Sequence, residues 1–298
     1  MRDRRSLLRR GAGVLVVLAL TGGVAACSDG DSAPTATEIV YVTESAGQTP
    51  SSTESSPATA PKRGLAASFE ALSRELGQPV GLSMAPVGGG EVVSLGEQTP
   101  QVAWSTIKVP LALAAQRKNG RMPAESPAIV ASDNGSAEAL WASLGTDQQA
   151  AAAVTAVLRE GGDENSVVPS ERRRPEFTIF GQTVWALPDA ATFTANLPCL
   201  PDSEYVVSLM AQVAENQQWG IEVIPNRSTA VKGGWGPSAG GGYVVRQIGL
   251  LTRKDGKQTA FAMTTYAPGA SLSSGIAALN RVGQWLGTRL AALPAGRC

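Results

Sequence analysis

The residues best placed for chemistry are Ser105 and Lys108, in the segment Ser105-Thr106-Ile107-Lys108. The chain contains no histidine, so a nucleophilic serine must take its base from a lysine or a carboxylate, and histidine-ligated zinc sites are excluded. At the start of a helix, a spacing of three places both side chains on one face. The positive end of the helix dipole there favours an oxyanion and a deprotonated lysine. The structural alternative is Ser105 as a helix N-cap with Lys108 in solvent.

Two further motifs follow in the sequence. Ser132-Asp133-Asn134 lies 27 residues after Ser105, and Lys232-Gly233-Gly234 lies 100 residues after Ser132. Taken singly, the first is typical of an Asx turn before a helix and the second of a charge at a strand end. Together, the order S-x-x-K, S-D-N, K-x-G resembles class A β-lactamases and penicillin-binding proteins.

The resemblance implies a role for each residue of the first two motifs. Ser105 would be the acylated nucleophile, and Lys108 would take its proton. Ser132 would pass a proton to the leaving nitrogen, and Asn134 would bind the amide side chain of the substrate. The substrate implied is a peptidoglycan peptide or a β-lactam, and the chemistry needs no metal or organic cofactor.

The third motif would supply the substrate-binding strand. The resemblance implies that Lys232 directs positive charge toward Ser132 and the substrate carboxylate, with Gly234 beside it. The backbone N–H groups of Ser105 and Trp235 would form the oxyanion hole. As side chains, Trp219 and Trp235 are assigned to core packing rather than to substrate stacking.

Two departures from the family pattern weaken the case for turnover. Gly233 occupies the position of a Thr or Ser whose hydroxyl binds the substrate carboxylate, and losing that bond costs tenfold or more in affinity. Glu171 is roughly in place of the hydrolytic glutamate, but no Leu-Asn follows it and three arginines do. Pairing with arginine makes a carboxylate a poorer base, so the expected behaviour is a persistent acyl-enzyme.

The N-terminus predicts an exported lipoprotein. Five arginines within residues 2–10 precede an apolar run over 14–20, and Val24-Ala25-Ala26-Cys27 resembles a lipobox. Residues 1–26 are expected to be removed, leaving lipidated Cys27 to hold the protein on the outer face of the cell membrane. Twin-arginine and general export both remain open. The alanine-rich chain that follows also resembles mycobacterial alanine-rich lipoproteins.

Composition divides the rest of the chain. Residues 27–62 are rich in Ser, Thr and Pro and predict a disordered tether, and residues 63–298 predict one domain. From Cys27 onward there are 20 basic and 24 acidic residues, which gives no case for nucleic-acid binding. Outside the cytoplasm, the remaining pair Cys199 and Cys298 is expected to form a disulfide.

Periodicity predicts an α/β (α+β) fold in which an antiparallel sheet built from both ends of the domain packs on a helical subdomain. The resemblance of the motifs implies that this fold is of the serine β-lactamase and transpeptidase type. The turn signal Lys254-Asp255-Gly256-Lys257 marks a C-terminal hairpin. Expected helices cover 65–76, 105–118, 136–144, 146–159, 188–197, 203–216 and 271–293; expected strands cover 80–84, 92–95, 229–232, 244–253 and 258–266.

Three functions fit these observations. The first is an acyl-serine enzyme acting on cell-wall peptides or β-lactams, which the three motifs and the export signal favour. The second is a non-catalytic relative that binds a wall fragment or a partner, which Gly233 and the missing Leu-Asn favour. The third is a structural or interaction lipoprotein, in which the motifs are incidental.

Overall fold

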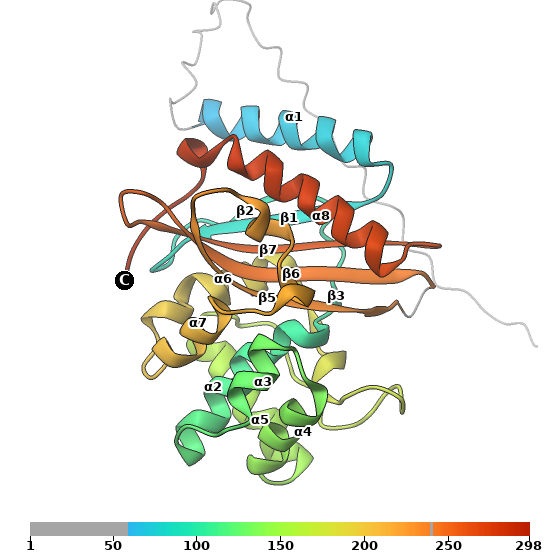
Figure 1. Ribbon diagram of the computed structural model, residues 1–298, viewed down its shortest axis with the longest axis vertical. Helices are drawn as coiled ribbons and strands as arrows, with labels where there is room; N and C mark the ends of the chain where they lie inside the picture. Colours follow the sequence, from blue (N-terminus) through green and yellow to red (C-terminus); the bar gives the residue numbers. More distant parts are fainter. Residues whose placement is uncertain (1–58, 239–240) are drawn as a thin grey trace, which may run out of the picture. The chain divides into compact units, whose positions relative to one another are not determined.

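The computed structural model describes residues 59–238 and 241–298 (Figure 1). The expected signal segment, the lipidation residue Cys27 and most of the expected tether lie outside these residues. Helix α1 (Thr59–Leu76) begins earlier than its predicted start at residue 65. The last four residues assigned to the tether, 59–62, are therefore helical.

The centre of the domain is a five-stranded antiparallel sheet with the strand order β2-β1-β7-β6-β5. The N-terminal strand β1 lies between β2 and β7, so both ends of the domain contribute to one sheet, as predicted. The strands are β1 (Val80–Pro86), β2 (Val93–Gly96), β5 (Ser228–Pro237), β6 (Tyr243–Thr252) and β7 (Gln258–Ala267).

Helices α1 and α8 (Leu272–Gly287) cover one face of the sheet (Figure 1). Helix α8 begins with a capping box between Ser271 and Ser274, which satisfies free N–H groups of its first turn. Its buried stripe includes Leu279 and Leu286, and it meets α1 where the rings of Phe69 and Trp285 pack edge to face at 5.2 Å. Helix α8 packs on β6 and β7, and α1 packs on β2.

Helix α6 (Leu187–Asn196) and the helical subdomain lie on the other face (Figure 1). The subdomain surrounds α2 (Lys108–Asn119), whose residues from Lys108 to Gln116 are all buried. Its other helices are α3 (Glu125–Val130), α4 (Asn134–Ser143), α5 (Asp147–Glu160) and α7 (Glu204–Met210). None of the helices in the described part of the chain combines the length and the apolar character needed to cross a membrane.

Several parts of the prediction differ from the structure, among them the last helix, which ends at Gly287 and not at residue 293. Helix α3 was not predicted. The helix expected over 203–216 ends at Met210, and residues 215–217 form a separate 3-10 turn. That break turns the chain so that Gln217 donates hydrogen bonds to the carbonyl oxygens of Ile129 and Val130 at the end of α3.

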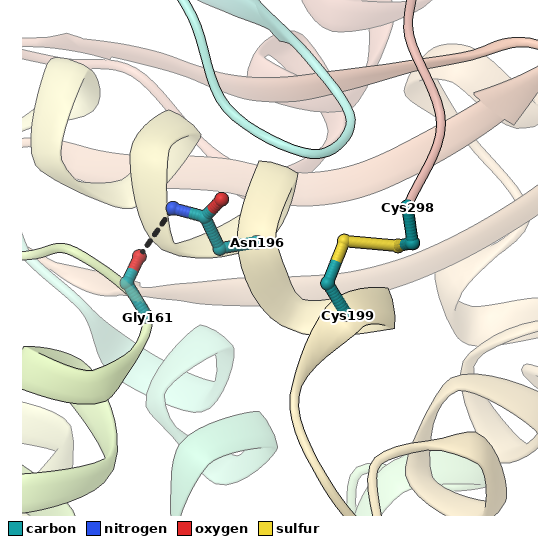
Figure 2. The surroundings of a disulfide bond; sticks show 4 residues. All are labelled: Gly161, Asn196, Cys199 and Cys298. Atoms are coloured by element: carbon teal, nitrogen blue, oxygen red, sulfur yellow. Dashed lines mark hydrogen bonds between the residues drawn. A yellow bond between two sulfur atoms is a disulfide. The ribbon is translucent and has the colours of Figure 1, made fainter.

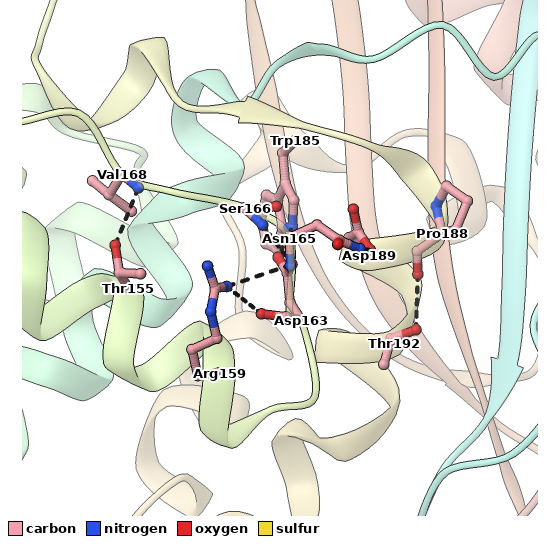
Figure 3. Close-up of polar contacts among 10 residues, drawn as sticks. All are labelled: Thr155, Arg159, Asp163, Asn165, Ser166, Val168, Trp185, Pro188, Asp189 and Thr192. Atoms are coloured by element: carbon pink, nitrogen blue, oxygen red, sulfur yellow. Dashed lines mark hydrogen bonds and ion pairs between the residues drawn. The ribbon is translucent and has the colours of Figure 1, made fainter.

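The segment after α5 is held by the carboxylate of Asp163, which is fully buried (Figure 3). One oxygen accepts from the backbone N–H groups of Asn165 and Ser166, and the other accepts from the indole N–H of Trp185 at 2.8 Å. The Arg159 guanidinium lies 3.9 Å from the same group. Asp163 thus fixes the start of the loop that borders the candidate site.

Cys199 and Cys298 form the predicted disulfide, with their Cα atoms 5.3 Å apart (Figure 2). The bond ties the last residue of the chain to the turn that follows α6. Nearby, the Asn196 amide donates to the carbonyl oxygen of Gly161 at 3.0 Å, joining the same turn to the end of α5.

Candidate active site

Ser105 lies in the 3-10 turn η1 (Trp104–Ile107), which leads directly into α2. The turn starts from a strained backbone, because Trp104 has a φ of 48°. It packs closely on β5: a Cβ atom added at Gly234 would lie 2.8 Å from the Ala103 carbonyl oxygen and 3.0 Å from the Ser105 nitrogen. Only glycine at position 234 permits this approach, so the third motif positions the first.

Lys108 is the first residue of α2 and is fully buried. Its ammonium donates to the carbonyl oxygens of Ser132 and Asp133, at 2.7 and 3.2 Å, and to Asn134 Oδ1 at 2.8 Å. Burial lowers the pKa of Lys108 to about 8, against the opposing charge of Asp133. The hydrogen bonds of Lys108 therefore hold the S-D-N loop in place. Because its pKa is about 8, the side chain loses its positive charge under mildly alkaline conditions.

Ser132 joins the two lysines. Its backbone oxygen accepts from Lys108, and its hydroxyl accepts from Lys232 Nζ at 2.9 Å. The residue has a φ of 61°, a conformation that few non-glycine residues adopt. The pKa of Lys232 lies well below its ordinary value, first because of complete burial and second because of the positive charge of Lys108.

Gln217 completes the surroundings of Lys232, and sequence reasoning missed it. Its Oε1 atom accepts from Lys232 Nζ and from the backbone N–H of Gly233. The remaining hydrogen bond of Lys232 goes to the carbonyl oxygen of Gly233 at 2.9 Å. No local pattern marks a glutamine after a surface turn as a lysine partner, because the contact joins segments that are distant in sequence.

A cavity of about 250 Å³ opens above these groups. It brings together Ser105, Ser132, Asn134 and Trp235, which were all predicted site residues. Lys108 and Lys232 lie buried behind its wall. The full lining consists of Trp104, Ser105, Ser132, Asn134, Glu176, Phe177, Thr178, Trp235, Gly236, Pro237 and Tyr243.

Glu171 does not line this cavity; it is exposed on the loop after Asp163. The arginines that follow it pair elsewhere, Arg172 with Glu138 at 3.6 Å and Arg174 with Glu176 at 3.6 Å. The carboxylate that does line the cavity is Glu176. Its partner Arg174 also donates to the Pro237 carbonyl oxygen at 2.9 Å and so fastens the loop to the end of β5.

Arg246, on β6, holds the chain segment that precedes the nucleophile. Its side chain is fully buried, and one guanidinium nitrogen donates to the carbonyl oxygens of Gln101, Val102 and Trp185. These residues belong to β3 (Gln101–Val102) and β4 (Val184–Trp185), which pair with each other. Burial lowers the pKa of Arg246 to about 9. Arg246 therefore fixes β3, the strand that comes directly before Trp104 and Ser105 in the chain.

No family model matches this sequence, and no curated protein sequence matches it. Several solved structures are similar to the domain in fold. The TLA-3 extended-spectrum β-lactamase aligns with a TM-score of 0.61 at 15% identity, over 76% of this chain and 99% of that one. A β-lactamase from Xanthomonas campestris aligns with a TM-score of 0.59 at 16% identity, over 77% and 98%.

A β-lactamase from Chitinophaga pinensis gives a TM-score of 0.61 at 15% identity, over 75% of this chain and 99% of that one. The domain therefore has a serine β-lactamase-like fold. Among such structures, its neighbours include class A β-lactamases, such as an ancestral one with a TM-score of 0.56 at 18% identity, over 74% of this chain and 98% of that one.

Proposed function

We propose that this protein is an exported lipoprotein whose domain accepts an acyl group on Ser105 from a β-lactam or a cell-wall peptide and releases it slowly or not at all. In acylation, an ester bond forms between Ser105 Oγ and the carbonyl carbon. The carbon–nitrogen bond breaks, and the serine proton passes to the nitrogen.

The observation that carries this proposal is that Ser132 accepts hydrogen bonds from both Lys108 and Lys232. The Ser132 hydroxyl faces the same cavity as Ser105 and accepts from Lys232. Because Lys232 donates to the hydroxyl oxygen, the hydroxyl proton of Ser132 is left free to pass to a leaving nitrogen. Lys108, with a pKa of about 8, is the candidate for taking the proton of Ser105.

Slow deacylation follows from the carboxylates around the cavity. A hydrolytic base must lie within hydrogen-bond reach of a water beside the ester. Glu171 is exposed away from the cavity, and the Glu176 carboxylate that lines it is paired with Arg174. These positions favour a persistent acyl-enzyme, which is the behaviour of a penicillin-binding protein.

The proposal for the membrane rests on the sequence around Cys27. A diacylated Cys27 would hold the protein at the outer face of the cell membrane, on a tether with an end-to-end reach of about 30 Å. Metabolic labelling with a palmitate analogue tests this. Label and membrane association in the parent chain, both absent from Cys27→Ala, are the expected results; equal label in both chains contradicts the proposal.

A second candidate, a non-catalytic binding lipoprotein, is favoured by the contacts of Lys108. Its three N–H donors are matched by three acceptors in the loop 132–134. A lysine used in this way stabilises the loop and takes no proton. In this alternative, the cavity binds a wall fragment without reacting.

The decisive experiment is the intact mass of the soluble domain after incubation with a fluorescent penicillin and, separately, with a fluorophosphonate. Both reagents acylate or phosphonylate active serines, and Ser105→Ala is the matched control. A stable adduct of one ligand on the parent domain alone supports the acyl-serine proposal. If neither reagent gives an adduct on Ser105, the proposal is wrong and the binding lipoprotein remains.

A further inference from the structure

We propose that the Ser105 site does not recognise its acyl donors through a carboxylate beside the reactive carbonyl, in contrast to the carboxylate recognition that a K-[TS]-G motif provides. This inference rests on the proposed acylation of Ser105 and adds the class of substrate. Four features of the described residues carry it.

The first feature is the space at position 233. A Cβ atom added to Gly233 would lie 2.7 Å from Cζ2 of Trp219 and 3.3 Å from Cζ3 of Trp235. The two indoles pack edge to face with their centroids 6.4 Å apart. A threonine or serine cannot be accommodated at this position while Trp219 keeps its place. The missing hydroxyl is thus one part of a packed arrangement.

Trp219 is held firmly in that place. It is buried, and its indole N–H donates to the Asn216 carbonyl oxygen at 2.9 Å. The next residue, Gly220, donates its backbone N–H to Asn280 on α8 at 2.7 Å, and its carbonyl lies against Gly283 so closely that a Cβ there would overlap it. Helix α8 therefore fixes the indole that fills the space beside Gly233.

The second feature is the saturation of Lys232. A lysine ammonium has three N–H donors. Here they are matched by three acceptors within the protein: Ser132 Oγ, Gln217 Oε1 and the Gly233 carbonyl oxygen. The side chain is fully buried. A ligand carboxylate would have to displace one of these bonds to reach the ammonium.

The third feature is the charge of the cavity. Of the described residues that line it, Glu176 alone is charged, and it is negative. The nearby Arg174 is not free to bind a ligand carboxylate, because its guanidinium pairs with Glu176, donates to Pro237 and lies over the Phe177 ring at 4.2 Å. The described lining therefore offers a ligand carboxylate no free cationic side chain.

The fourth feature is the aromatic surface that takes the place of a carboxylate site. Trp104, Phe177, Trp235 and Tyr243 all line the cavity. Trp104 and Phe177 pack edge to face at 4.9 Å, and the Trp104 indole N–H is buried without a hydrogen-bond partner. Flat apolar walls suit an acyl donor that carries an aromatic or aliphatic group.

The test compares benzylpenicillin with its methyl ester, which differ at the carboxylate alone. The acylation rate constant of Ser105 is measured for each by intact mass, with Ser105→Ala as the blank. We expect the ester to acylate at least as fast as the acid. An acid that reacts tenfold faster or more overturns the inference and leaves the acyl-serine proposal standing. If neither the acid nor the ester gives an adduct, the inference is wrong. The fluorophosphonate reaction then decides separately whether Ser105 is a nucleophile.

A pair of double variants tests the cause. Trp219→Ala with Gly233→Thr opens the space and restores a hydroxyl, whereas Trp219→Ala with Gly233→Val opens the space without one. A hydrogen bond to a charged group changes affinity by about tenfold or more, so we expect the acid-to-ester rate ratio to rise by that factor in the threonine variant only. An equal ratio in two folded variants, verified by circular dichroism, contradicts the assignment of Trp219.

Discussion

Gly234 of β5 lies against the backbone of Ser105, so closely that a Cβ atom at Gly234 would be 3.0 Å from the Ser105 nitrogen and 2.8 Å from the Ala103 carbonyl oxygen. The nucleophile and the substrate strand are therefore in direct contact. Both partners are backbone atoms, which cannot move aside as the end of a flexible side chain can.

The first prediction concerns this contact. Gly234→Ala should displace η1, lower the free energy of unfolding by about 1–3 kcal/mol, and reduce the rate of Ser105 acylation at least tenfold. Chemical denaturation and intact mass measure the two effects. Gly64→Ala is the matched control, because a Cβ at Gly64 meets nothing within 4 Å and alanine favours the helix. Equal losses in both variants would contradict the contact.

The second prediction concerns the pH dependence of stability. The pKa of Lys108 falls from 10.5 to about 8 on burial. Between these values the unfolded chain binds a proton that the folded chain does not, so stability falls as the pH decreases from 10.5 to 8 and then levels off. This lysine should contribute about 3 kcal/mol to the change.

Urea unfolding at pH 8 and pH 10.5 measures this change for the parent domain and for Lys108→Met. The variant removes the titrating group but keeps an unbranched side chain of similar length. The difference between the two chains gives the effect of Lys108, including the effect of its charge on Lys232. If both chains show the same change with pH, burial does not lower the pKa of Lys108.

The third prediction concerns Gln217, which joins α3 to β5. Gln217→Met leaves Lys232 and the Gly233 N–H short of an acceptor and leaves two α3 carbonyl groups short of a donor. We expect a loss of about 1–3 kcal/mol in the free energy of unfolding, together with slower acylation of Ser105. Gln218→Met is the control: Gln218 is exposed, and the one described hydrogen bond of its side chain goes to the Val213 carbonyl oxygen. A loss in the control as large as that in Gln217→Met would contradict the bridging role.

The fourth prediction concerns the disulfide between Cys199 and Cys298, which encloses a sequence separation of 99. Replacing both cysteines by serine should lower the free energy of unfolding by about 2–4 kcal/mol. Reducing agent should destabilise the parent domain by the same amount and should leave the double variant unchanged. An effect of the reductant on the double variant would show that another process is being measured.

Elements with local signals were predictable from the sequence. The Thr146 and Gln149 capping box marked α5, and the structure contains both of its hydrogen bonds. The helix expected over 271–293 is present as α8, although it ends at Gly287. The pairing of Cys199 with Cys298 followed from the number of cysteines. Each of these signals lies within one segment or depends on composition.

The contacts that shape the site were less predictable, because they join distant segments. Strand β5 runs from Ser228 to Pro237, although only 229–232 was predicted. Its glycines resemble strand breakers. In the structure, each glycine instead leaves room for a close neighbour. Gly233 lies against Trp219, Gly234 against the η1 backbone, and Gly236 against the Trp104 ring. Trp219 was assigned to the core, and its burial agrees with that assignment. Its contact with Gly233 had no sequence signal.

The placement of β1 determines when the domain can be completed during synthesis. Strand β1 pairs with β2 on one side and with β7 on the other. Until β7 has been made, the N-terminal hairpin lacks its larger partner, and a two-stranded hairpin alone is marginally stable in water. Synthesis must pass Ala267, the last residue of β7, before the sheet can close. Folding is therefore a late event, and a chain that ends before Gln258 has no β7 with which to complete it.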